Sequence, residues 1–339
     1  MPTPALTTTI AALLARGKGI LAADESTPSI KKRFDSIHLV STAESRRDYR
    51  EMLFTTPGLG ESISGVILFD ETLRQKTKAG VPFTEVLTRQ GIVPGIKVDT
   101  GAVELAAFLG EKITEGLDGL RARLAEYVRL GARFAKWRAV IEIGDGLPSA
   151  GAIAANAEAL ARYAGLCQEA GLVPIVEPEV LMDGDHSIER CEAAIVQTLR
   201  AVFSALESHR VELEGMILKS GMVLSGAECP QQAFDGEIAA ATLRCFRRSV
   251  PAAVPGIVFL SGGQAAVPAT ARLNAIAALG PQPWWITFSY GRALQDPALK
   301  LWGGAPAKVP AAQAALQHRA RCNALAVQGK YSAASESAA

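Results

Sequence analysis

The chain has 339 residues, of which 49% are apolar and 20% charged, with 35 Lys and Arg against 34 Asp and Glu. These proportions predict a globular protein with a large core, and a net charge of +1 excludes overall attraction to nucleic acid or anionic lipid. Pro and Gly interrupt the uncharged stretches 249–271 and 273–291, so neither predicts a transmembrane helix. No basic region precedes the N-terminal apolar segment, which argues against a secretory signal.

Short apolar runs rich in β-forming residues predict eight strands. In chain order they cover residues 19–24, 65–70, 95–99, 134–140, 173–179, 216–223, 256–261 and 284–290. Their starts are 28 to 46 residues apart, the spacing of a strand followed by a crossover helix. Eight such units favour a (β/α)8 barrel. An open doubly wound sheet is the alternative, but it usually has six strands, and no Gly-x-Gly-x-x-Gly opens the first turn.

The segments between the strands have helical composition. Residues 152–170 are rich in Ala, and residues 187–208 carry apolar side chains at helical spacing, with Asp185 or Ser187 as the expected cap. No linker interrupts the units, so we expect one barrel domain over residues 1–331. Residues 332–339 are small and polar and predict a flexible C-terminal tail.

The five cysteines are odd in number and widely separated, with no Cys-x-x-Cys pair. They predict reduced, mostly buried thiols in a cytoplasmic protein. The four histidines are far apart and form neither a His-x-x-x-His nor a His-Glu-x-x-His pair, so we expect no metal site.

Most predicted strands finish in a charged or hydroxyl residue. The strand-end residues are Asp24, Asp70, Lys97, Asp99, Lys136, Arg138, Glu177, Glu179, Lys219, Ser261 and Ser289. Any one of these residues, taken alone, is explained as a surface charge in a loop. Their recurrence at the same end of different strands instead indicates a site, because buried parallel strands are normally apolar and barrel active sites lie at this end.

Residues two apart on a strand share a face, so Lys136 projects with Arg138 and Glu177 with Glu179. Several lysines in one poorly solvated cavity lower each other's pKa, and a neutral amine can attack a carbonyl to form a Schiff base. A neighbouring carboxyl group can then move the protons. These considerations do not distinguish which lysine is the nucleophile.

Two segments predict phosphate binding. Ser261-Gly262-Gly263 follows the seventh strand, and Ser289 to Arg292 follows the eighth, the usual place of a barrel phosphate site. The glycine pair could equally serve only as a turn. A second cluster after the first strand is weaker, because a solvated helix face also explains it; its members are Ser26, Ser29, Lys32 and Arg33. Together the clusters indicate a substrate with phosphate at both ends.

Five segments resemble class I fructose-bisphosphate aldolase. They are residues 17–26 (GKGILAADES), 134–138 (FAKWR), 173–179 (VPIVEPE), 259–264 (FLSGGQ) and 288–295 (FSYGRALQ). The resemblance extends from about residue 17 to 331. It implies a barrel that needs no cofactor, usually a homotetramer, which reversibly cleaves fructose 1,6-bisphosphate to dihydroxyacetone phosphate and glyceraldehyde 3-phosphate in glycolysis and gluconeogenesis. Sedoheptulose 1,7-bisphosphate and fructose 1-phosphate share the keto-phosphate end, so the sequence does not distinguish them from fructose 1,6-bisphosphate as the substrate.

The resemblance also implies residue roles. Lys219 would form the Schiff base, and Glu177 would transfer protons, with Glu179 nearby. Asp24 would assist removal of the C4 hydroxyl proton, and Lys136 would stabilise charge near the reacting carbons. The residues implied to contact substrate or phosphate are Ser26, Ser29, Arg33, Lys97, Arg138, Ser261, Gly262, Gly263, Ser289, Gly291 and Arg292.

The chain departs from the animal enzymes of this family at two places. Ser220-Gly221 follows Lys219 where those enzymes have Pro-Asn, and residues 331–339 lack their terminal tyrosine. Either another group or water would then protonate the dihydroxyacetone phosphate carbon, or turnover would be limited at that step. The alternatives are a phosphate-binding barrel isomerase, a Schiff-base transaldolase, or a scaffold that binds actin or another partner. None of these accounts for the whole set of segments and buried charges.

Overall fold

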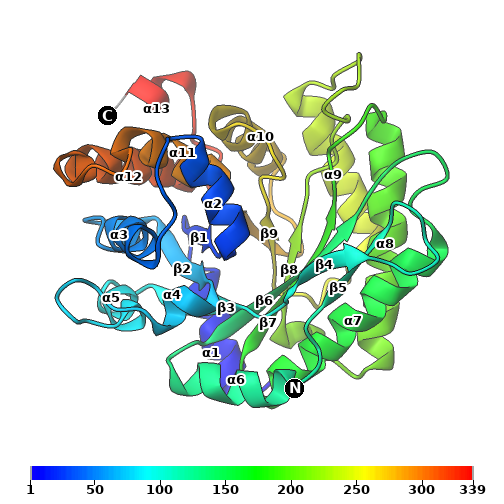
Figure 1. Cartoon of the computed structure of the whole chain (residues 1–339). Helices are drawn as coiled ribbons and strands as arrows, with labels where there is room; N and C mark the ends of the chain where they lie inside the picture. Colours follow the sequence, from blue (N-terminus) through cyan, green and yellow to red (C-terminus); the bar gives the residue numbers. More distant parts are fainter. Residues whose placement is uncertain (1, 338–339) are drawn as a thin grey trace.

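A closed barrel of parallel strands forms the centre of the computed structural model, which describes residues 2–337 (Figure 1). The strands follow one another around the barrel in the order β1-β2-β3-β6-β7-β8-β9-β10, and β10 pairs with β1. Their bounds are β1 Gly19–Ala23, β2 Ile63–Leu68, β3 Val93–Lys97, β6 Phe134–Ile141, β7 Val173–Val180, β8 Ile217–Ser220, β9 Gly256–Phe259 and β10 Trp285–Tyr290.

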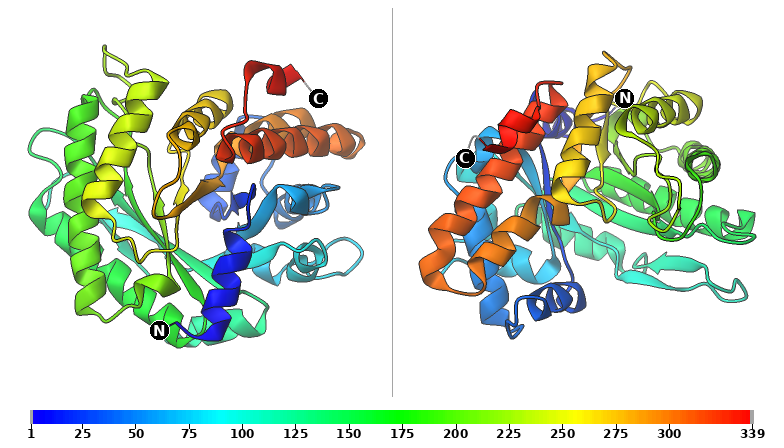
Figure 2. Two further views of the ribbon diagram at one scale, coloured as in Figure 1. Left: turned by 180° about the vertical axis from the view of Figure 1, so that it is seen from behind. Right: turned by 90° about the horizontal axis from the view of Figure 1, so that it is seen from above.

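Helices surround the barrel, as the two views of Figure 2 also show. The α-helices are α1 Pro4–Leu13, α2 Thr27–Asp35, α3 Ala43–Phe54, α4 Asp70–Arg74, α5 Phe83–Arg89, α6 Leu120–Arg129, α7 Ala150–Glu169, α8 Ile188–Ser208, α9 Asp235–Ser249, α10 Ala266–Ala278, α11 Arg292–Trp302, α12 Val309–Val327 and α13 Ala333–Ser337. Short 3-10 helices are η1 Leu59–Glu61, η2 Leu213–Gly215 and η3 Pro306–Lys308. Across residues 2–337, no helix has both the length and the apolar character needed to cross a membrane.

Two apolar layers fill the molecule. The outward-facing strand residues pack against the helices, and the inward-facing residues form a separate cluster inside the barrel. The inner cluster consists of Ile20, Ala22, Ile67, Phe134, Val173, Ile175, Ile217 and Val258 together with Leu6, Ile10 and Leu13 of α1. Helix α1 therefore closes the N-terminal end of the barrel, which leaves the C-terminal end for the site.

Two glycines make room for the largest side chain inside the barrel. A Cβ atom on Gly95 would lie 2.3 Å from the Phe134 ring, and one on Gly65 would lie 2.5 Å from Leu13. Real side chains do not approach this closely, so both strands need glycine here to let Phe134 and α1 fill the interior.

The structure confirms the predicted barrel and all eight predicted strands, with shifted ends. The segment predicted as strand to residue 223 ends at Ser220, because Val223 donates its N–H to Thr242 Oγ1 rather than to a neighbouring strand. The antiparallel hairpin of β4 Gly101–Glu104 and β5 Lys112–Glu115 was not predicted. It has no buried apolar face to create an alternating pattern, and it projects from the barrel (Figure 2).

The helix and cysteine predictions agree with the structure. Helices α7 and α8 cover the two predicted segments, and Ser187, not Asp185, caps α8 by accepting the Arg190 N–H. All five cysteines are free thiols, four of them buried and Cys229 half-buried.

The C-terminal segment contains more structure than its composition indicates. Residues 333–337 form α13, and Glu336 accepts hydrogen bonds from Tyr331 and Arg319. Residues 338–339 lie outside the described residues. The flexibility expected for residues 332–339 stays a prediction.

Candidate active site

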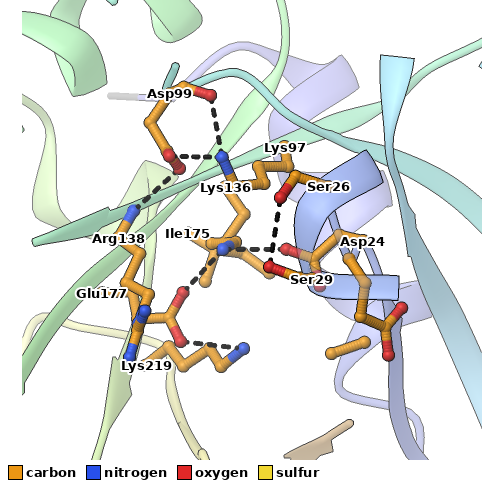
Figure 3. Close-up of polar contacts among 12 residues, drawn as sticks. Asp24, Ser26, Ser29, Lys97, Asp99, Lys136, Arg138, Ile175, Glu177 and Lys219 are labelled. Carbon is orange, nitrogen blue, oxygen red and sulfur yellow. Dashed lines mark hydrogen bonds and ion pairs between the residues drawn. The ribbon is translucent and has the colours of Figure 1, made fainter. Parts of the chain in front are cut away.

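Four charged side chains meet at the C-terminal end of the barrel. Asp24 directly follows β1, Lys136 belongs to β6, Glu177 to β7 and Lys219 to β8. Each continues an inward-facing row of apolar residues, as Lys219 does two positions after Ile217. Figure 3 shows their side chains pointing toward one another. The barrel interior is therefore apolar below and charged at its C-terminal end.

The four groups form a row of alternating charge, here called the ion-pair row. Lys136 Nζ lies 2.8 Å from Asp24 Oδ2 and 3.1 Å from Glu177 Oε2, and Lys219 Nζ lies 3.0 Å from Glu177 Oε1. The side chains of Lys136, Glu177 and Lys219 are only 3–4% exposed, and that of Asp24 is 14% exposed. Pairing is what permits charges at such depth, and two cations with two carboxylates leave the row neutral.

The ion pairs shift the pKa values of Asp24, Glu177 and Lys136. Burial alone would raise the pKa of the Asp24 and Glu177 carboxyls, but Lys136 and Lys219 outweigh it, and both pKa values lie below their usual range. Burial alone would lower the pKa of Lys136, yet Asp24 and Glu177 raise it above its usual range. The expectation that clustered lysines lower one another's pKa is therefore wrong for Lys136, because two carboxylates flank it. Lys136 stays protonated near pH 7.

A second chain of charges lies beside the row. Lys97 donates to the side chain and the carbonyl of Asp99, and the Asp99 Oδ2 atom accepts the Arg138 N–H at 3.2 Å. Arg138 in turn pairs with Glu179 through its Nε atom. Glu179 is thus bound to a guanidinium, whereas Glu177 is bound to two ammonium groups. The adjacent pair Glu177 and Glu179 therefore has two different environments.

Asp99 belongs to this chain but was not among the predicted site residues. It is buried, and it holds both Lys97 and the backbone of Arg138. The signal was available in the sequence, because Asp99 is one of the charged strand ends and shares a face with Lys97.

The loops after β9 and β10 come together on the other side of the row. Gly262 and Gly263 have φ values of 56° and 96°, which favour glycine. A Cβ atom on Gly263 would lie 3.5 Å from Arg292 Nη2, so the guanidinium of the second loop reaches the glycines of the first. Ser261 is buried at the start of the first loop, and Gly291 directly precedes helix α11, which begins at Arg292. The arrangement offers backbone, hydroxyl and guanidinium donors to an anion.

Ser289 adds a buried donor to these loops. It alternates along β10 with Phe288 and Tyr290, which face the helices, so its hydroxyl points into the barrel. The Ser289 Oγ atom is buried and has no hydrogen-bond partner within residues 2–337. Buried hydroxyls are normally paired, so this hydroxyl is available to a bound ligand.

The cluster after β1 is only partly assembled. Ser26 precedes α2, and its hydroxyl lies 3.1 Å from that of Ser29 (Figure 3). Lys32 is exposed on the same helix. The Arg33 guanidinium instead pairs with Glu25 and with Asp296. The structure therefore does not bring Arg33 to the ion-pair row.

A barrel with this buried lysine–carboxylate row, and with anion-binding loops after its last two strands, defines a class of enzyme. In that class a lysine amine attacks the carbonyl group of a phosphorylated substrate.

Comparisons with known proteins give the family. The model of the family "Fructose-bisphosphate aldolase class-I" matches residues 5–339. A probable fructose-bisphosphate aldolase class 1 of Xanthomonas campestris pv. campestris is 58% identical over 330 residues, covering 96% of this chain and 98% of that protein. A fructose-bisphosphate aldolase of Plasmodium falciparum is 52% identical, covering 96% and 89%. A solved structure of fructose-bisphosphate aldolase from Plasmodium falciparum, in complex with TRAP and a small-molecule inhibitor, matches with a TM-score of 0.96 and 52% identity and covers 97% of this chain and 95% of that one.

The chain belongs to the class-I fructose-bisphosphate aldolase family and is a lyase that acts through a lysine Schiff base. The family, the fold and the reaction implied by the sequence motifs are thereby confirmed.

Proposed function

We propose that Lys219 forms the Schiff base with the keto carbon of fructose 1,6-bisphosphate and that Glu177 moves the protons this step requires. The observation that carries the proposal is the 3.0 Å contact between the buried Lys219 Nζ and Glu177 Oε1 atoms at the C-terminal end of the barrel. Lys136 and Lys97 are the other lysines of the site, and each is held more tightly by carboxylates. Lys136 lies between Asp24 and Glu177, and Lys97 is bound to Asp99.

Imine formation starts with a proton transfer. The Lys219 ammonium gives one proton to Glu177 and becomes a nucleophile. Its nitrogen adds to the C2 carbonyl, and one of the protons left on nitrogen passes to the C2 oxygen, which gives the neutral carbinolamine. Glu177 has now lost one of its two adjacent cations, so its pKa rises and it can hold the proton. It returns this proton to the C2 hydroxyl of the carbinolamine, which leaves as water, and the protonated imine remains.

Carbon–carbon cleavage requires a base at the C4 hydroxyl. Asp24 is ionised because Lys136 and Lys219 hold its pKa below the usual range, so it is ready to accept that proton. The electrons of the C3–C4 bond then pass to the imine, which becomes a neutral enamine, and the aldehyde product leaves. Lys136 stays a cation and stabilises negative charge that develops on the C4 oxygen.

The anion-binding loops bind one end of the substrate. We assign one phosphate to Ser261, Gly262, Gly263, Ser289, Gly291 and Arg292, because the two loops converge and Ser289 has a buried, unpaired hydroxyl. We assign the rest of the substrate to Ser26, Ser29, Lys97 and Arg138. Arg33 joins them only if it exchanges its present partners. Glu179 acts by holding Arg138 in position.

Borohydride trapping tests the proposal. The protein is incubated with dihydroxyacetone phosphate and excess EDTA, reduced with borohydride, digested and analysed by mass spectrometry. We expect a reduced adduct on the peptide that contains Lys219, and none on that peptide in Lys219→Met. An adduct on Lys136 or Lys97, or trapping that fails in EDTA, would show that the residue roles are wrong.

We also propose that the protein is a cytoplasmic homotetramer. Support comes from the resemblance to the aldolase family and, for the location, from the reduced cysteines. Light scattering coupled to size-exclusion chromatography measures the mass directly. A monomer or dimer at micromolar concentration would contradict the tetramer.

A further inference from the structure

Three potential metal ligands meet where α13 packs against α12. His318 and Cys322 are four residues apart on α12 and so share one face of that helix, and Glu336 approaches them from α13. His318 Nε2 lies 3.6 Å from Cys322 Sγ and 3.5 Å from Glu336 Oε2. All three ligand atoms lie within 4.8 Å of one another. Figure 1 places α13 on the outside of the helix ring.

These separations fit one tetrahedral ion. Zinc bonds of about 2.3 Å to sulfur and about 2.0–2.1 Å to nitrogen, at the tetrahedral angle, put the two ligand atoms about 3.5 Å apart. A nitrogen and a carboxylate oxygen on the same ion are separated by about 3.4 Å. The two measured distances agree with both values. An imidazole, a thiolate and a carboxylate are also the ligand types that zinc prefers.

The surroundings of Glu336 hold its carboxylate toward His318. Oε1 accepts a hydrogen bond from Tyr331 Oη at 2.6 Å and another from Arg319 at 2.6 Å. Oε2 faces His318 and also accepts from Arg319 Nη1, so a bound ion would share this oxygen with Arg319. Arg319 is itself anchored to Thr270 and to the Ala266 carbonyl of α10. Such outer partners orient the carboxylate as they do in metal sites.

We propose that His318, Cys322 and Glu336 form a site for a zinc-type divalent ion that fastens α13 to α12, with water as the fourth ligand. The Cys322 thiol loses its proton to solvent when the Sγ–metal bond forms, and no redox change occurs. The site lies on the outer helices, apart from the ion-pair row, and its role is structural.

The same residues also form a clasp without an ion, because Arg319 pairs directly with Glu336. Its positive charge disfavours a second cation, whereas the thiolate and the carboxylate favour one. The test must therefore distinguish a metal site from a clasp that consists of the Arg319–Glu336 ion pair alone.

Cobalt(II) is a suitable probe, since tetrahedral cobalt–thiolate sites have an intense sulfur-to-metal charge-transfer band. The full-length protein is freed of metal with a chelator, dialysed and titrated with Co²⁺. We expect one equivalent to produce the band and Zn²⁺ to abolish it. Cys322→Ser removes the thiolate, and Cys229→Ser, at the half-buried cysteine of another loop, is the matched control.

The expected effects are graded. Cys322→Ser loses the band. Both Cys322→Ser and His318→Gln weaken zinc binding, by more than the roughly 10–100-fold that is typical when a residue outside the ligand set is changed. Tyr331→Phe weakens it by about 10-fold. Retained aldolase activity shows that each variant is folded.

Absence of the band in the wild-type protein, or its persistence in Cys322→Ser, would overturn the proposal and leave an ion-pair clasp only. If Cys322→Ser does not fold, X-ray absorption of the wild-type zinc complex decides. It must contain one sulfur at about 2.3 Å, and a shell of nitrogen and oxygen alone refutes the site.

Discussion

Replacing Glu177 by glutamine isolates the proton-transfer role assigned to this carboxylate. Glutamine keeps the shape of the side chain but cannot accept the proton of Lys219, whose Nζ atom lies 3.0 Å from Oε1. General acid–base catalysis contributes about 10²–10⁴-fold, so the rate of imine formation should fall by this factor, or about 3–5 kcal/mol of barrier. Rapid mixing with dihydroxyacetone phosphate, followed by borohydride quenching at set times, measures that rate directly.

Glu179→Gln is the matched control, because it changes the carboxylate two residues away that pairs with Arg138. We expect it to raise KM through the loosened Arg138 while the trapping rate at saturating substrate falls by less than about 10-fold. A Glu177→Gln variant that traps at the wild-type rate would refute the reasoning. Equal slowing by the two substitutions would do so as well, since the effect would then be electrostatic rather than specific to one proton acceptor.

Three further predictions follow from individual contacts. Lys136→Met should lower the free energy of unfolding by about 3–5 kcal/mol at pH 7, since it leaves buried carboxylates short of a cation. The depressed pKa values of Asp24 and Glu177 stabilise the folded state above their unfolded values near 4. Urea titrations should therefore show this deficit shrinking as the pH falls below about 4, and a constant deficit would contradict the argument. Ser289→Ala should raise KM for fructose 1,6-bisphosphate by about 10-fold or more without loss of stability, because the unpaired hydroxyl contributes only when it meets phosphate; an unchanged KM in steady-state assays would exclude that contact. Gly95→Ala should destabilise the barrel by about 1–3 kcal/mol or more, since its Cβ would lie 2.3 Å from Phe134. Gly165→Ala in helix α7, whose added Cβ would meet nothing within 4 Å beyond the neighbouring backbone of its own helix, should stabilise the protein by about 0.5–1 kcal/mol. Equal urea midpoints would refute the steric argument.

The parts of the fold that were predictable are those with a repeated pattern. Buried parallel strands must be apolar throughout, so eight runs at crossover spacing led to the barrel, and their polar ends led to Lys136, Glu177 and Lys219. The hairpin of β4 and β5 has no such requirement, because it is largely exposed. Sequence patterns therefore reveal the elements whose residue types are constrained by burial.

Side-chain contacts between residues far apart in the sequence were not predictable in the same way. Sequence places Arg33 beside Ser26 and Ser29, but its guanidinium binds Asp296, which is 263 positions away. Long side chains choose among several partners in space, and the sequence does not rank them. The same limit explains why the four-residue spacing of His318 and Cys322 gave no signal until α13 brought Glu336 beside them.

The ion-pair row also explains how a lysine held by a carboxylate can become a nucleophile. A proton that moves from Lys219 to Glu177 turns an ion pair into a neutral pair, and the two heavy atoms are already 3.0 Å apart. Burial penalises charged groups, so it favours the neutral pair, whereas Lys136 opposes the transfer by stabilising the Glu177 carboxylate. Asp24 weakens that opposition, because it shares the Lys136 charge from the other side. The alternation of charges along the row therefore leaves Glu177 within 3.0 Å of Lys219 Nζ, close enough to take its proton when a carbonyl arrives.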